Sequence, residues 1–147
     1  MNLINNEIKK LANLKKTKEY FVTLGFNHQT FTISKALMVM EKIKSFDWVH
    51  SCRAVLENFR ENGQHPHTHF YIKTDLPKSK VLEKLWATSG IKTIILKKSF
   101  IDIKPAEECH KKYIMLQKKD IKMSYVSQDE EWRKENNIPI LEKNWCV

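Results

Sequence analysis

The chain has 147 residues and a formal net charge of +9, and 41% of its residues are hydrophobic while 29% are charged. This length and composition fit one domain with one hydrophobic core and exclude an intrinsically disordered chain. The three cysteines form no Cys-x-x-Cys pair, which argues against a zinc cluster or a disulfide framework and favours a reducing, intracellular location. The lysines are dispersed, and an excess of this size favours a polyanionic partner, most simply nucleic acid.

The N-terminal segment, residues 1–17, is expected to form a helical extension. Apolar residues recur in it at helical spacing between Leu3 and Leu14. The segment is too polar and too rich in lysine for a secretory signal, and no apolar run in the chain approaches the length of a membrane span. The sequence therefore predicts a soluble protein without membrane contact.

Four strands and three helices are expected after this extension. Runs of β-branched and aromatic residues predict the strands, and apolar residues at helical spacing predict the helices. Thr32 or Ser34 is a suitable N-cap for the first helix, and Pro105 would stand in the favoured first turn of the last one. The expected strands are 19–26, 47–59, 68–74 and 92–104, and the expected helices are 32–46, 78–90 and 105–120.

The order of these elements predicts the fold class. Strand, helix, strand, strand, helix, strand, helix is typical of an α+β fold of the ferredoxin-like or RNA-recognition-like type, a split β-α-β sandwich. We expect a central antiparallel sheet of about five strands, with helices packed on one face and the other face free to receive a ligand. This domain is expected to span 18–120, and residues 121–147 are expected to pack on it as a C-terminal extension.

Three of the six histidines stand at alternate positions just after the turn signal Asn62-Gly63: His65, His67 and His69. Residues two apart in a strand share a face, so His67 and His69 could bind one metal ion together. His65 precedes Pro66, which interrupts strand pairing, and it is expected at the mouth of the turn and outside the ligand set. The alternative is that these histidines are solvated residues of an exposed strand.

A third ligand is expected from the neighbouring strand. A hairpin through Asn62-Gly63 would bring the strand at 47–59 alongside the histidines. Glu57 is the carboxylate of that strand able to face them, and Glu61 is the second choice because it lies nearer the turn. Two imidazoles and a carboxylate form a mixed nitrogen and oxygen set, which suits Mn²⁺ or Mg²⁺ with open water positions.

Tyr113 is the one tyrosine of the expected helix at 105–120, where it stands among lysines. A tyrosine between Ile114 and Leu116 is usually a boundary residue of the core, and this is the ordinary interpretation. Next to a divalent ion that polarises a phosphate, however, a tyrosine can act as a nucleophile. The phosphodiester that it forms with DNA keeps the energy of the broken strand for rejoining.

Three motifs together resemble those of the HUH-type replication initiator endonucleases, the Rep proteins of circular single-stranded DNA viruses and rolling-circle replicons. They are "FVTLGFN" at 21–27, "PHTHF" at 66–70 and "KKYIMLQKKD" at 111–120, in the family's order. The resemblance covers residues 18–120. It implies an enzyme that nicks and joins single-stranded DNA at an origin stem-loop through a 5′-phosphotyrosine and so initiates rolling-circle replication.

The resemblance also implies residue roles. The family's lysine follows its tyrosine on the same helical face; one turn after Tyr113 this chain has Leu116 and Gln117, so either Lys118 or another residue fills that role. Tyr125 is the second candidate for the nucleophile. The implied set is Tyr113 and Lys118 in catalysis, Glu57, His67 and His69 on Mn²⁺ or Mg²⁺, and Phe21, Thr23 and Arg53 on DNA.

Other functions stay open at this point. A single-tyrosine HUH transposase or relaxase would share the chemistry and differ in the DNA ends that it recognises. An RNA-recognition-like binding module without catalysis belongs to another class, and the missing Gly-rich aromatic motif on the strand at 92–104 counts against it. A viral origin would place the protein in the host nucleus, and a following helicase domain and a homo-oligomer of the full-length protein are left open.

Overall fold

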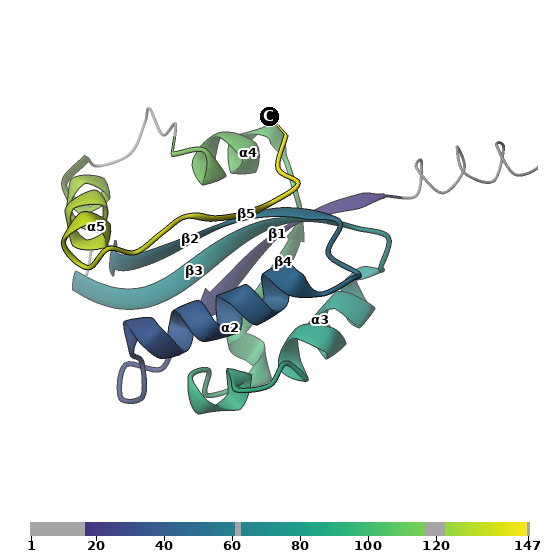
Figure 1. Ribbon diagram of the computed structural model, residues 1–147, viewed down its shortest axis with the longest axis horizontal. Coiled ribbons are helices and arrows are strands. Elements are labelled where there is room, and N and C mark those ends of the chain that lie inside the picture. Colours follow the sequence, from purple (N-terminus) through teal and green to yellow (C-terminus); the bar gives the residue numbers. More distant parts are fainter. Residues whose placement is uncertain (1–16, 61–62, 117–122, 147) are drawn as a thin grey trace, which may run out of the picture.

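A five-stranded antiparallel sheet with the strand order β4-β1-β3-β2-β5 forms the centre of the protein (Figure 1). The computed structural model describes residues 17–60, 63–116 and 123–146. The strands are β1 (Lys18–Gly25), β2 (Ser51–Arg60), β3 (Gly63–Thr74), β4 (Ile101–Pro105) and β5 (Leu141–Lys143). The helices are α2 (Ile33–Ser45), α3 (Lys78–Trp86), α4 (Glu108–Ile114) and α5 (Met123–Glu135), with short 3-10 helices at Ile91–Thr93 and Lys98–Phe100.

The expected α+β fold with a split β-α-β sandwich is confirmed. Strands β1 and β2 both pair antiparallel with β3, so they run in the same direction with β3 between them, and α2 connects them. Residues 1–16 of the expected N-terminal helical extension lie outside the described residues, and so do Glu61 and Lys118. No helix in the described part of the chain is long and apolar enough to cross a membrane.

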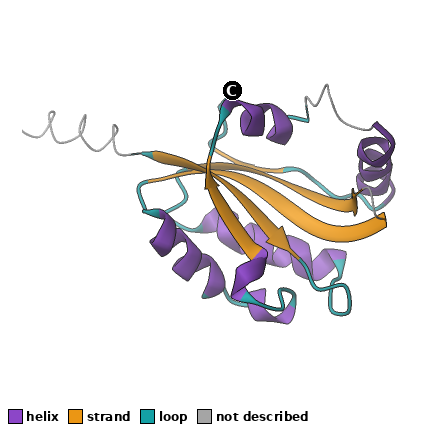
Figure 2. Ribbon diagram, turned by 180° about the vertical axis from the view of Figure 1, so that it is seen from behind, coloured by secondary structure: helices purple, strands orange, loops and turns teal. Residues whose placement is uncertain are grey.

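The helices lie on both sides of the sheet, and Figure 2 shows the same arrangement from behind. Helices α2 and α3 cover one face, as expected, and bury the larger hydrophobic cluster there. Helix α4 lies on the opposite face, which was expected to be open, and its Ile114 packs against Phe21, Val55 and Tyr71. The second face is therefore partly roofed by a short helix.

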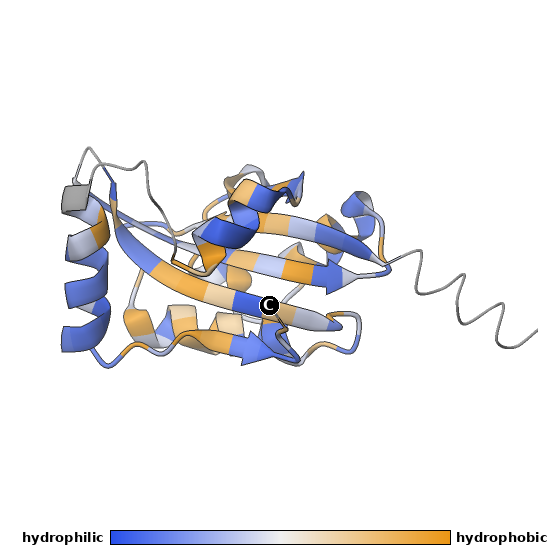
Figure 3. Cartoon of the chain, turned by 90° about the horizontal axis from the view of Figure 1, so that it is seen from above, coloured by the Kyte–Doolittle hydropathy of each residue, from blue (hydrophilic) through white to orange (hydrophobic). Residues whose placement is uncertain are grey.

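Alternation along the strands separates the two faces. Side chains of successive residues point to opposite sides of a sheet, and Figure 3 shows hydrophobic and hydrophilic residues interleaved along the strands. The face under α2 and α3 is formed by apolar residues of the three central strands: Tyr20, Val22, Leu24, Cys52, Ala54, Leu56, Phe70 and Ile72. The residues between them, such as Thr23, Glu57 and His69, belong to the face under α4.

The strand expected at 92–104 is wrong over its first part. Gly90 has a φ of +88°, which favours glycine and turns the chain. The chain then forms two 3-10 turns, and β4 begins only at Ile101. Ile91, Ile94 and Ile95 are all buried in the core. A strand would have placed the adjacent Ile94 and Ile95 on opposite faces, so burial of both favours the helical turn.

Pro105 ends a strand instead of starting a helix. It pairs with Tyr20 as the last residue of β4, where a missing N–H is tolerated because β4 is an edge strand. Helix α4 begins three residues later, at Glu108. The nitrogen atom Nδ1 of His110 accepts a hydrogen bond of 3.0 Å from the backbone N–H of Glu107 and so satisfies a group at the start of the helix.

His65 was expected outside the strand, and this is wrong, because β3 includes both His65 and Pro66. A bulge makes this compatible with proline. Glu57 pairs with His67 while Phe59 pairs with Gln64, so two residues of β3 stand opposite one residue of β2. The ladder is interrupted where Pro66 has no N–H to donate.

The C-terminal segment adds a strand to the sheet and holds the bulge of β2 and β3 in place. Strand β5 pairs with β2 and forms the second edge of the sheet. On α5, the oxygen Oδ1 of buried Asp129 accepts hydrogen bonds from the backbone N–H groups of Asn58 (2.7 Å) and Phe59 (3.0 Å). These are the N–H groups of β2 at the bulge, so Asp129 fixes the strand immediately after Glu57.

Candidate active site

The three expected metal ligands lie together on the sheet face under α4. Glu57 on β2 stands directly opposite His67 on β3, and His69 follows on the same face. Oε1 of Glu57 is 3.6 Å from Nε2 of His67 and 3.3 Å from Nε2 of His69. One ligand atom from each of the three lies within 4.8 Å of the others, and all three residues are buried. His65 is not part of this group.

Both histidines are held with Nε2 directed at the carboxylate. Nδ1 of His67 forms a hydrogen bond with the backbone carbonyl of His65. A carbonyl only accepts, so Nδ1 carries the proton and Nε2 of the neutral ring keeps its lone pair. Nδ1 of His69 lies 2.9 Å from Oγ1 of Thr23, which can accept in the same way. Such outward bonds from the second ring nitrogen orient histidines that bind metals.

Tyr113 reaches this group from α4. Its hydroxyl donates to Oε1 of Glu57 at 2.8 Å and lies 3.2 Å from Nε2 of His69. Its ring meets the His69 ring edge-on, with centroids 4.9 Å apart. Burial raises the pKa of Tyr113 far above its ordinary value, and the carboxylate of Glu57 raises it further. Because burial and the carboxylate both raise this pKa, the phenol keeps its proton and donates it in the hydrogen bond to Glu57.

Arg53 fixes the end of the helix that carries Tyr113. Its Nε donates to the backbone carbonyl of Ile114 at 2.8 Å, and its Nη1 forms an ion pair with Glu142 of β5. A cation at the last carbonyl groups of a helix satisfies them and complements the helix dipole. Ile114 itself is fully buried in the cluster under α4. These contacts hold α4 above the sheet at the tyrosine.

Phe21 forms the wall of the site towards β1. Its ring stacks on His69 with centroids 5.0 Å apart and on His110 of α4 with centroids 4.5 Å apart. The residues expected on DNA, Phe21, Thr23 and Arg53, thus all make contacts inside the protein, and their contact with DNA stays a prediction. Sequence reasoning missed the support by Thr23 and Arg53, although Thr23 stands two residues after Phe21 and so shares its strand face.

Of the remaining candidates, Tyr125 is in the first turn of α5, close enough to Tyr113 for its charge to contribute to the raised pKa of Tyr113. Lys118 and Glu61 are outside the described residues. Glu107, Cys109 and His110 form a second group with metal-ligand spacing around the start of α4, where the first two side chains are exposed.

Comparisons of the chain with protein-family models, with curated proteins and with solved structures found no match. No relative therefore assigns a role to any of these residues. Roles for this site follow from its geometry and chemistry.

The donor set fits a divalent cation. Glu57 is 3% exposed, and its carboxylate lies within 3.6 Å of a ring nitrogen of each histidine, so the three side chains present their donor atoms to one small volume. Two imidazole nitrogens and one carboxylate oxygen leave further coordination positions for water or substrate, unlike a closed structural zinc site.

Proposed function

We propose that this protein is a metal-dependent nickase and ligase of single-stranded DNA, of the HUH replication initiator type, with Tyr113 as the nucleophile. The observation that carries the proposal is the position of the tyrosine hydroxyl at hydrogen-bond distance from two of the three candidate ligands. Tyr113 is 56 residues from Glu57 and 44 from His69 in the chain. Side chains from β2, β3 and α4 thus meet in one small volume, and this supports a joint chemical role.

In this proposal Glu57, His67 and His69 hold Mn²⁺ or Mg²⁺. A bound divalent ion would polarise the scissile phosphate and offset the charge that develops on it. Oη of Tyr113 forms a bond to phosphorus while the bond from phosphorus to O3′ breaks. The phenolic proton leaves to water, and O3′ takes up a proton from water. The products are a 5′-phosphotyrosine and a free 3′-hydroxyl, and the reverse reaction rejoins the strand.

The charge of the protein supports a nucleic-acid substrate. Lys111 and Lys112 immediately precede Tyr113 on α4, and the chain as a whole carries +9. Cations close to a site attract the phosphate groups of a nucleic acid to it. If several lysines bind phosphates of a single strand, the affinity should fall with salt, with a log-log slope of about 0.7 for each phosphate contact.

An adduct assay tests the proposal. The full chain is incubated with Mn²⁺ and a random-sequence pool of single-stranded oligonucleotides labelled at their 3′ ends, and then run on a denaturing gel. The 3′ fragment stays on the tyrosine, so the label should migrate with the protein. Tyr113→Phe should abolish this band while leaving DNA binding unchanged, and chelation of the metal should do the same. Tyr125→Phe, the matched control, should keep it.

A binding module without catalysis is the second candidate function. The raised pKa of Tyr113 and its hydrogen bond to Glu57 favour it, because both fit a structural tyrosine. The same assay separates the two functions. A module would bind the pool with the expected salt dependence and form no covalent band with any metal. A transposase or relaxase of the HUH type would form the band and differ in the sequence that it selects from the pool.

A further inference from the structure

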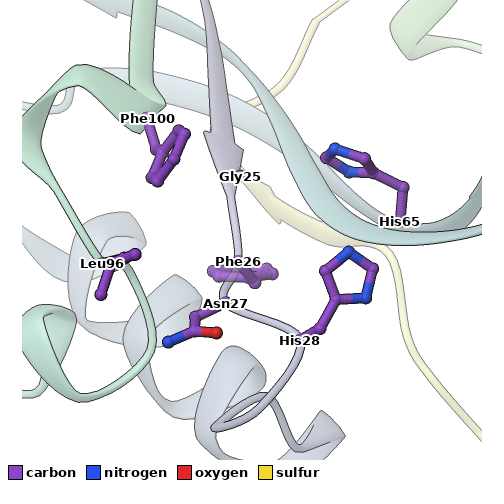
Figure 4. Close-up of a pocket in the computed structure, with 7 residues that line it drawn as sticks. All are labelled: Gly25, Phe26, Asn27, His28, His65, Leu96 and Phe100. Carbon is purple, nitrogen blue, oxygen red and sulfur yellow. The ribbon is translucent and has the colours of Figure 1, made fainter.

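A cavity lies next to the candidate active site, at the end of β1 (Figure 4). Its volume is about 240 Å³. Leu96 and Phe100 form an apolar wall on one side, the rings of His28 and His65 lie on the other side, and Gly25, Phe26 and Asn27 lie between them. The proposed nicking chemistry uses none of these side chains.

The apolar wall is unusually exposed. Leu96 is 61% and Phe100 47% exposed, and the one other exposed large hydrophobic residue in the described parts of the chain is Met38 on α2, at 55%. Exposed apolar groups gathered at one pocket mark a place where something binds. Phe26, which lies between the two sides, is 4% exposed and stacks on Phe31, so the pocket has a rigid aromatic residue in its lining.

The opposite side offers hydrogen-bonding groups. The rings of His28 and His65 meet edge-on with centroids 5.6 Å apart. Both rings line the pocket, and an imidazole has one nitrogen that can donate and one that can accept a hydrogen bond, so the ring edges can bind polar groups of a ligand.

The pocket adjoins the candidate metal ligands. Gly25 pairs across the strands with His67, and the rings of His65 and His67 are 5.8 Å apart. Two exposed lysines, Lys97 and Lys98, lie in the chain between the two residues of the apolar wall. A ligand here would thus have a flat apolar part in the pocket and negative charge near both the lysines and the metal ligands.

We propose that this pocket binds one unpaired nucleobase of the DNA strand, next to the phosphate that Tyr113 attacks. The proposal rests on the proposed function. A base has a π-face for Phe100, polar edges for the histidines, and phosphates on both sides for the cations, a combination typical of single-strand binding. The volume lies below the roughly 300–1,000 Å³ of pockets for drug-sized ligands, which suits a single ring system.

Binding without metal tests the pocket separately from the chemistry. In the presence of a chelator, the full chain is titrated with a labelled thymidine oligonucleotide and with an abasic strand of the same length, which has the phosphates and sugars but no bases. Phe100→Ala should weaken binding of the thymidine strand about fivefold or more, since base stacking on an aromatic residue is worth about 1–3 kcal/mol. Binding of the abasic strand should not change.

Met38→Ala is the control, because it removes an equally exposed hydrophobic residue from α2 and should change neither affinity. Leu96→Ala is a second variant of the wall and should also weaken only the thymidine strand. Equal affinities for Phe100→Ala and the unmodified chain would overturn the pocket proposal. The exposed apolar wall would then be assigned to binding of a protein partner. Equal weakening on both strands would overturn it as well.

The outcomes for the pocket and for the nicking function are distinguishable. A covalent band in the adduct assay without an effect of Phe100→Ala leaves the nickase standing and removes the base pocket. A selective effect of Phe100→Ala without any covalent band keeps the pocket and removes the nickase. Failure of the unmodified chain to bind either strand would overturn the pocket, and the adduct assay with the random pool would then decide the nickase by itself.

Discussion

The two faces of the sheet are built from the same strands and differ in what they bury. Under α2 and α3 the buried side chains are almost all apolar and form one continuous cluster. Under α4 a small cluster around Phe21 and Tyr71 borders three buried groups that can carry charge, Glu57, His67 and His69. Burying such groups costs free energy, whereas burying apolar surface supplies it. One face thus stabilises the fold, and this allows the other to hold a chemical site.

Truncation of the apolar face should have the largest effect on stability. Phe70 is fully buried at the centre of β3, with its side chain in the cluster under α2 and α3. Phe70→Ala should lower the free energy of unfolding by about 3–5 kcal/mol, because it removes buried surface and leaves a cavity. Denaturant unfolding followed by circular dichroism measures this. A loss below about 1 kcal/mol would mean that this face is not the stabilising one.

Disruption of the bulge beside Glu57 should have the next largest effect on the free energy of unfolding. Asp129→Ala leaves the N–H groups of Asn58 and Phe59 without their acceptor, and an unsatisfied buried donor costs about 1–3 kcal/mol. Denaturant unfolding should show a loss of that size, and metal affinity should fall because the strand that carries Glu57 loosens.

Asp129→Asn is the matched variant, because its amide oxygen can still accept from these groups. It should therefore keep most of the stability that Asp129→Ala loses. Equal losses in both variants would show that the charge of Asp129, and not its acceptor oxygen, holds the bulge.

Removal of a ligand from the polar face should change stability little. His69→Ala, measured without metal, should leave the free energy of unfolding within about 1 kcal/mol or raise it, since a clustered polar group is removed. Addition of Mn²⁺ should raise the melting temperature of the unmodified chain, because a ligand that binds the folded state stabilises it.

The same addition should not move the melting temperature of His69→Ala or Glu57→Gln. His50→Ala, which removes an exposed histidine paired with Asp75, should respond to Mn²⁺ like the unmodified chain. Equal shifts in all variants would place the metal outside the group of Glu57, His67 and His69.

Thiol labelling distinguishes the two faces without changing stability. Cys52 is fully buried under α2, and this burial raises its pKa to about 11. Cys109 on α4 and Cys146 are exposed. Because the thiolate is the reactive form, an alkylating reagent at pH 8 should modify Cys109 and Cys146 in the folded protein and Cys52 only after unfolding. Mass spectrometry of the peptides reads this directly, and fast labelling of Cys52 would contradict the assigned face.

The sequence predicted both the sheet and the meeting of Glu57 with the histidines, because alternation and a hairpin turn are local signals. The predictions from the sequence failed where contacts between distant parts of the chain determine the local structure. Ile91–Thr93 forms a 3-10 helix, and Ile91, Ile94 and Ile95 are all buried in the core. Pro66 lies in a strand because a bulge, held by Asp129 of α5, accommodates it. The partners of Arg53 come from α4 and β5, and no local pattern predicts contacts at such separations.

The location of the nucleotide in the covalent adduct tests the central claim most directly. The denatured adduct formed with Mn²⁺ is digested with nuclease and trypsin, and the modified peptide is sequenced by mass spectrometry. The proposed function predicts a nucleotidyl group on Tyr113 alone. A nucleotidyl group on Tyr125, or no modified tyrosine in a preparation that binds DNA and Mn²⁺, would contradict it.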